Sequence, residues 1–84
     1  MSDKEILKKQ IIYRSVHRGT KELDILLGNF VKKYIDEFTY IDLKNLHELL
    51  LIEDEVLYQW FFEKKDNYNM PKNHVTEKLK CFKL

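Results

Sequence analysis

The sequence predicts an all-α fold: a single small bundle of four or five short helices, in one domain that spans residues 1–84. Two observations carry this prediction. The chain has only two glycines and one proline, a scarcity that favours helices with short connections over a sandwich or barrel rich in turns. Apolar residues recur every three or four positions over most of the length, as on one face of an α-helix. A chain of this size has room for one core and little room for a deep enzyme cleft.

The first helix is expected from about Asp3 to about Ser15. Ser2 and Glu5 have the spacing of a capping box, in which two side chains satisfy the free amides at a helix start. Apolar residues follow at helical spacing: Ile6, Leu7, Ile11 and Ile12. Gly19 is expected to end this segment, because glycine adopts a positive φ without the steric cost of a Cβ.

The second helix is expected to begin near Glu22, after Thr20 as its cap, and it carries the strongest amphipathic pattern in the chain. Its apolar positions recur every three or four residues: Leu23, Leu26, Leu27, Phe30, Val31, Tyr34, Ile35 and Phe38. Gly28 lies inside this stripe and costs roughly 1 kcal/mol relative to alanine. We therefore expect a neighbouring element to pack closely against Gly28.

The second half of the chain is expected to hold the remaining helices. Thr39 resembles the cap of a third helix that ends near Ile52, with its apolar face made by Leu43, Leu46, Leu49 and Leu50. The acids at 53–55 suit the positive start of a fourth helix, and Lys64 and Lys65 suit its negative end. Residues 66–71 have the composition of a loop, and a short fifth helix is expected at about 72–84.

The composition disfavours several classes of protein. Fifteen Lys and Arg against fourteen Asp and Glu give a formal charge of +1, so no bulk attraction to nucleic acid is expected. No signal-peptide pattern opens the chain, and its apolar runs are far shorter than the ~20 residues that cross a bilayer. We therefore expect no direct membrane insertion and a place in the bacterial cytoplasm, or in the mitochondrial matrix for a mature eukaryotic form.

No metal site, bound cofactor or catalytic centre is expected either. The candidate metal ligands lack a Cys-x-x-Cys or His-x-x-x-His pair: His17, His47, His74 and Cys81. The carboxylates lie where helix caps and solvated faces would place them, and no glycine-rich loop follows a strand to hold a dinucleotide. The sequence therefore predicts a protein that is not an enzyme.

One segment gathers charged groups around a glycine and is the candidate partner-binding site: Arg14, His17, Arg18, Gly19, Glu22 and Asp24. Arg18 offers a planar fork of donors, and the bare backbone of Gly19 allows a partner to approach closely. The residues also allow a purely structural account, in which Gly19 turns the chain and Arg18 pairs with Glu22 on the surface for less than ~1 kcal/mol. Trp60 is a second candidate, as a core residue or as a partner anchor.

The segment 18–24 resembles the Arg-Gly-x-x-Glu signature of the succinate dehydrogenase assembly factor 2 family, called the flavinylation factor in bacteria. The likeness covers roughly residues 12–62. It includes Tyr13 ahead of the signature, the leucine-rich run at 23–27, and the acidic stretch that leads to Trp60. His17 departs from the family pattern, which often has Arg or Lys at this position.

This resemblance implies a chaperone that binds the flavoprotein subunit of succinate dehydrogenase, or of fumarate reductase, and promotes covalent attachment of FAD to that subunit. The FAD would be attached to the client, with no cofactor bound stably by this chain, and the free protein is expected to be monomeric. Two alternatives stay open. One is a helical nucleic-acid-binding module, suggested by the basic group Arg14, His17, Arg18 and Lys21; the other is a generic interaction or oligomerisation domain.

Overall fold

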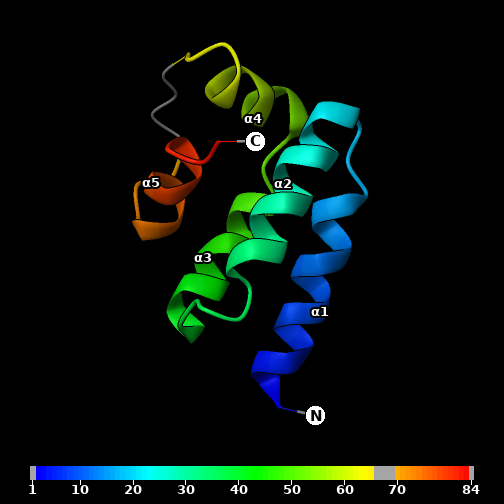
Figure 1. The fold of residues 1–84 in the computed structure, drawn as a ribbon, viewed down its shortest axis with the longest axis vertical. Helices are drawn as coiled ribbons and strands as arrows, with labels where there is room; N and C mark the ends of the chain where they lie inside the picture. The colour runs from blue at the N-terminus through cyan, green and yellow to red at the C-terminus, as the bar shows by residue number, and fades with distance from the viewer. Residues whose placement is uncertain (1, 66–69, 84) are drawn as a thin grey trace.

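Five α-helices make up the part of the chain that the computed structural model describes, residues 2–65 and 70–83 (Figure 1). They are α1 (Asp3–Val16), α2 (Lys21–Tyr34), α3 (Tyr40–Leu50), α4 (Asp54–Phe61) and α5 (His74–Lys80). These ranges contain no β-strand, so the predicted all-α class is confirmed. None of the described helices is long and apolar enough to span a bilayer.

The first three helices form the body of the bundle. They lie side by side and run alternately up and down, with α1 in contact with both α2 and α3 (Figure 1). The short α4 lies across one end and contacts α2, while α5 packs on the flank of α3. This arrangement places the α1–α2 turn (residues 17–20) at the same end of the molecule as the α3–α4 connection (residues 51–53).

Helix starts are fixed by local side-chain caps. The side chains of Ser2, Thr20 and Thr39 each accept a hydrogen bond from the backbone amide three residues later, which confirms the caps predicted for α1, α2 and α3. Asn73 caps α5 in the same way and exchanges reciprocal hydrogen bonds with Thr76. Each cap satisfies an amide that has no partner inside its helix.

The core is built mainly on α2. One face of this helix is fully or almost fully buried, at Leu23, Leu26, Leu27, Phe30 and Val31. The other elements contribute Ile11, Leu43, Leu46, Leu49, Leu50, Leu57, Val75 and Leu79. Burial of an aliphatic or phenyl side chain contributes about 1.5–3 kcal/mol, so this shared cluster is what holds the helices together.

Two helices end earlier than their patterns predict. The apolar stripe of α2 continues to Phe38, but the helix stops at Tyr34, and Ile35 and Phe38 are buried from the turn that follows. The helix α4 ends at Phe61, before the two lysines expected in its last turn. The loop predicted at 66–71 lies mostly outside the described residues.

The close packing expected at Gly28 is not what the structure shows. A Cβ built on Gly28 would lie 3.5 Å from Cγ1 of Val16, an ordinary van der Waals distance. The contact between α1 and α2 therefore leaves room for an alanine at this position.

Candidate functional site

Arg18 lies in the α1–α2 turn, yet its side chain is only 8% exposed. Its guanidinium group reaches the opposite connection of the bundle. Nη1 donates to the carbonyl oxygen of Leu50 at 2.6 Å and Nη2 donates to that of Ile52 at 3.1 Å. The planar fork is therefore used inside the protein, where it joins two turns that are far apart in the sequence.

Asp54, the first residue of α4, completes this contact. One carboxylate oxygen forms an ion pair with Nη2 of Arg18 at 2.6 Å, and the other accepts a short hydrogen bond from the backbone N–H of Gly19. We call these groups the Arg18 network: Arg18, Gly19, Asp54, and the carbonyls of Leu50 and Ile52. A single carboxylate thus holds both the side chain and the backbone of the turn.

The ends of two helices explain why the network forms at this place. The final carbonyls of α3 have no partners within the helix, and they lie at the negative end of its dipole. Arg18 supplies both the donors and the positive charge that this end favours. Asp54, in turn, lies at the positive start of α4. The network therefore neutralises two helix ends as well as one ion pair.

Within the network, one donor of Arg18 is left without a partner: its buried Nε makes no hydrogen bond to any described residue. A buried donor without a partner costs free energy, so this nitrogen reduces the stabilisation that the Arg18 network gives.

Gly19 lets the carboxylate of Asp54 approach closely, and a side chain here would force that carboxylate to shift. A Cβ on Gly19 would lie 2.8 Å from Oδ2 of Asp54, closer than a real Cβ contact allows. The positive φ predicted for Gly19 is wrong, since neither Gly19 nor Gly28 has one. The reason for glycine here is space beside a carboxylate.

Two more contacts fix the turn from the side of α2. Asp24 accepts a hydrogen bond from the backbone N–H of Arg18 at 2.7 Å, and Thr20 caps α2 through the amide of Leu23 at 3.2 Å. The consecutive amides of Arg18 and Gly19 therefore each donate to a carboxylate, one from Asp24 and one from Asp54. The shape of the turn is determined by charges on two different helices.

The remaining candidate residues face solvent around this turn. Glu22 is exposed in the first turn of α2, and Arg14 is exposed near the end of α1. The His17 ring stacks on the ring of Tyr13, with centroids 4.0 Å apart and planes inclined by 20°, and its Nδ1 lies 2.7 Å from the Tyr13 carbonyl oxygen. The turn thus presents a bare glycine, an acid and a stacked aromatic pair.

The structure corrects the pairing suggested for Arg18. The sequence account paired it with Glu22 on the surface, but its partner is Asp54, and the contact is largely buried. The basic group proposed for nucleic acid is also weakened, because the charge of Arg18 is compensated inside the protein. The sequence predicts Asp54 only as an acid at a helix start, because local spacing carries no sign of its contact with Arg18.

Trp60 lies half-buried near the end of α4, where it packs against the edge of the core. It also lines a surface pocket with Phe61, Lys64, Lys65 and Lys80, away from the Arg18 network. Its packing against the core fits the first of the two roles considered for it, its role as a partner anchor stays a prediction, and the site at the turn does not include it.

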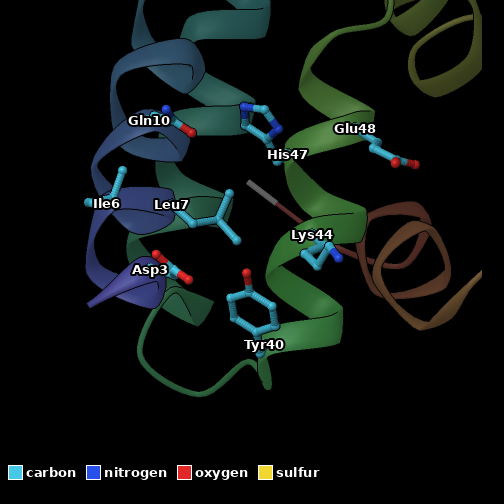
Figure 2. Close-up of a pocket in the computed structure, with 8 residues that line it drawn as sticks. All are labelled: Asp3, Ile6, Leu7, Gln10, Tyr40, Lys44, His47 and Glu48. Atoms are coloured by element: carbon cyan, nitrogen blue, oxygen red, sulfur yellow. The ribbon is translucent and has the colours of Figure 1, made fainter. Parts of the chain in front are cut away.

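A second hollow lies between α1 and α3, with a volume of about 250 Å³ (Figure 2). Figure 2 shows Leu7 and the Tyr40 hydroxyl directed into it, while Glu48 extends away. From α1 the hollow is lined by Asp3, Ile6, Leu7 and Gln10, toward the opposite end of the helix from the turn. Residues 2–65 and 70–83 contain no group of His, Cys, Asp and Glu arranged to hold a metal ion.

Comparisons with known proteins point to one family. A family model described as "flavinator of succinate dehydrogenase" matches residues 9–83. A protein of Scheffersomyces stipitis named succinate dehydrogenase assembly factor 2, mitochondrial, is 36% identical over 75 residues, which are 89% of this chain and 50% of the relative. The protein of the same name in Dictyostelium discoideum is 34% identical over 95% of this chain and 55% of its own length.

A bacterial relative is matched over a shorter stretch. The FAD assembly factor SdhE of Acetobacter pasteurianus is 36% identical over 66% of this chain and 50% of its own length. The chain thus spans about half the length of these curated relatives. No solved structure is significantly similar to it.

Proposed function

We propose that this chain, which belongs to the family of flavinators of succinate dehydrogenase, promotes the covalent attachment of FAD to a flavoprotein subunit. The subunit is that of succinate dehydrogenase or of fumarate reductase. The chain does so by binding the flavoprotein through the α1–α2 turn. The observation that supports this surface is the Arg18 network, which holds the turn in one shape from both sides.

A turn that is already ordered loses little conformational entropy when a partner binds. A flexible loop has to be ordered when it binds, and this cost lowers its affinity. A rigid turn avoids most of that cost and is therefore the better docking surface. The backbone of Gly19 is exposed beside the Asp54 carboxylate, so a partner can reach it, and Glu22 offers a second exposed carboxylate nearby. Arg14 and His17 border the same surface.

In this proposal Arg18 acts on the partner indirectly. Its guanidinium is committed to Leu50, Ile52 and Asp54, so it fixes the position of the neighbouring backbone and is not itself the main contact. Asp24 has the same kind of role through the amide of Arg18. The partner would therefore bind the residues that the network positions.

The covalent bond would form on the flavoprotein, between its own residue and FAD. This chain would favour a conformation of the client in which the two are correctly placed, and the effect is limited by its difference in affinity between client conformations. Monomeric action is part of the proposal, in the compartment where the flavoprotein matures: the bacterial cytoplasm, or the mitochondrial matrix in eukaryotes.

Glu22→Gln tests the docking surface with little effect on the fold, because this side chain is exposed. Glu37→Gln is the matched control, since Glu37 is also exposed but follows the far end of α2. The measurements are binding to the purified flavoprotein and the yield of covalent flavin, seen as fluorescence that stays with the subunit after denaturation. We expect Glu22→Gln to lower both and Glu37→Gln to lower neither; equal behaviour of the two variants would refute docking at the turn.

A further inference from the structure

A pocket at the other end of α4 has the features of a second binding site. It is lined by Trp60 and Phe61 and by Lys64, Lys65 and Lys80, the last of these from α5. The volume is about 230 Å³. Two aromatic residues and three lysines therefore line one hollow, with no acidic residue among the described residues that line it.

The charge of the chain is unevenly distributed along its sequence. Residues 64–84 contain six lysines and two acids, a formal charge of +4, while residues 1–63 contain nine basic and twelve acidic residues, a formal charge of −3. The C-terminal region is therefore basic although the whole chain is nearly neutral, and three of its six lysines line the pocket. Positive charge of this kind attracts acidic groups.

The lysines of the pocket differ in whether their positive charges are paired with a carboxylate. Lys65 forms an ion pair with Glu63 at 3.2 Å, so its charge is partly compensated. The ammonium group of Lys64 lies 5.2 Å from the centre of the Phe61 ring, a cation–π distance. Within the described ranges, neither Lys64 nor Lys80 is in an ion pair, so both are available to an incoming carboxylate.

The backbone of Lys64 follows the C-terminal end of α4. Its φ is 57°, in the left-handed region where glycine fits without strain and a lysine does not. The next amide, that of Lys65, donates back to the carbonyl oxygen of Gln59 at 3.1 Å, as at the end of many helices. The conformation of Lys64 is therefore part of the helix cap, and only the side chains of the pocket indicate what it binds.

We propose that this pocket binds an acidic peptide segment of the flavoprotein, with carboxylates of the segment on Lys64 and Lys80 and an apolar side chain against Trp60. The identity of the partner rests on the proposed function. The site is separate from the α1–α2 turn, so the two ends of α4 serve two contacts with one client. With a rise of 1.5 Å per residue, the eight residues of α4 keep these contacts about 12 Å apart along its axis, within one interface of standard size.

The size and charge of the pocket favour a peptide over other anions. Pockets that enclose small molecules measure about 300–1,000 Å³, so this hollow is small for a nucleotide but suited to one or two side chains. Nucleic acid is disfavoured because the formal charge of the whole chain is only +1 and residues 1–63 are net negative, which opposes contact with a long phosphate backbone. The aromatic wall, finally, offers apolar contact that bare phosphate does not use.

The first test compares two double variants that change the net charge equally. Lys64→Glu with Lys80→Glu reverses the charge of the pocket, and Lys4→Glu with Lys32→Glu is the control, at two exposed positions outside it. Binding of the purified flavoprotein is expected to weaken about tenfold for the pocket variant, since two exposed ion pairs become repulsive, and to stay within about twofold for the control. Equal loss in the two variants would reduce the effect to net charge and overturn the proposal.

The result is distinguishable from failure of the proposed function. If Glu22→Gln weakens binding and the pocket variant does not, the docking turn stands and the acidic-segment proposal fails. If the unsubstituted protein and all the variants fail to bind the flavoprotein, the proposed function fails as well.

The second test uses Trp60 as a local probe, because it is the single tryptophan of the chain. Its fluorescence is followed during titration with the peptide Glu-Leu-Glu-Glu, with the uncharged analogue Gln-Leu-Gln-Gln, and with inorganic pyrophosphate. A saturable change with the acidic peptide alone supports the proposal. No change with any probe, or an equal change with pyrophosphate, would overturn it.

Lys64→Gly separates the binding role from a structural one. The substitution relieves the left-handed strain, so thermal stability is expected to be unchanged or higher, whereas the response of Trp60 to the acidic peptide is expected to fall severalfold. Retention of the full response would remove Lys64 from the site and refute the proposal.

Discussion

Replacing Asp54 by alanine is expected to destabilise the protein far more than removal of a surface acid does. The substitution deletes the ion pair with Arg18 and also the acceptor of the Gly19 amide. The guanidinium remains, with a side chain only 8% exposed, so its charge is left without a carboxylate in a largely dry place. The same change leaves every apolar core residue intact, and the loss therefore reports on the network alone.

The size of this effect follows from burial. Removal of one partner from a buried ion pair costs about 3–5 kcal/mol, and loss of one hydrogen bond adds about 1 kcal/mol. Asp54 itself is 28% exposed, and the carbonyls of Leu50 and Ile52 still accept from Arg18, so we take a value of about 3 kcal/mol. Proteins of this length have total stabilities of about 4–12 kcal/mol, and the variant would lose a large part of that.

The assay is urea denaturation followed by circular dichroism at 222 nm, with the free energy of unfolding extrapolated to water. Asp36→Ala is the matched control, because Asp36 also pairs with a basic group, Lys8 at 3.0 Å, but its side chain is 87% exposed. A surface pair of this kind contributes less than about 1 kcal/mol. We expect the two variants to differ by about 2 kcal/mol or more.

A difference below about 1 kcal/mol would refute the view that the Arg18 network holds this end of the bundle. A double-mutant cycle with Arg18→Ala gives a second check. The two substitutions are expected to be non-additive by about 1–3 kcal/mol, as for groups in direct contact, and additive effects would show that the ion pair contributes little.

Three further substitutions test other features of the structure. Gly28→Ala is expected to raise stability by about 0.5–1 kcal/mol, because Val16 leaves room for the methyl group; thermal melting that shows a loss would restore the tight-packing interpretation. Gly19→Ala is expected to cost about 1–2 kcal/mol by displacing Asp54, and urea denaturation should show that cost largely disappear in the Asp54→Ala background. Asn73→Ala is expected to cost about 1 kcal/mol in the same assay by removing the cap of α5, and no loss would mean that tertiary contacts alone fix its start.

Helix starts were predictable because caps are local. A hydroxyl at Ser2, Thr20 or Thr39 needs only the amide three residues later, so the sequence contains the whole interaction. Helix ends were less predictable. The apolar pattern continues past Tyr34 because Phe38, which lies in the turn after the helix, is also buried in the core. An apolar pattern indicates which residues are buried, whether or not their backbone is helical.

The candidate site was predictable in its location and not in its contacts. The charged residues around Gly19 mark the turn, and the family signature lies on them. The partner of Arg18 was not predictable, because helical spacing suggests Glu22, four residues away, whereas the network joins positions 34 and 35 residues apart. Such contacts depend on the packing of α3 against α1 and of α4 against α2, which local patterns do not specify.

The dependence of the turn on α3 and α4 has a practical consequence for inhibitors. An excised peptide that carries residues 13–24 would retain every side chain of the candidate surface, but it would lack the carboxylate of Asp54 and the carbonyls that hold Arg18. In solution such a peptide would sample many conformations and would compete poorly for the client that we propose. An effective mimic would have to impose the shape of the turn by other means, such as a macrocycle that replaces the distant carboxylate.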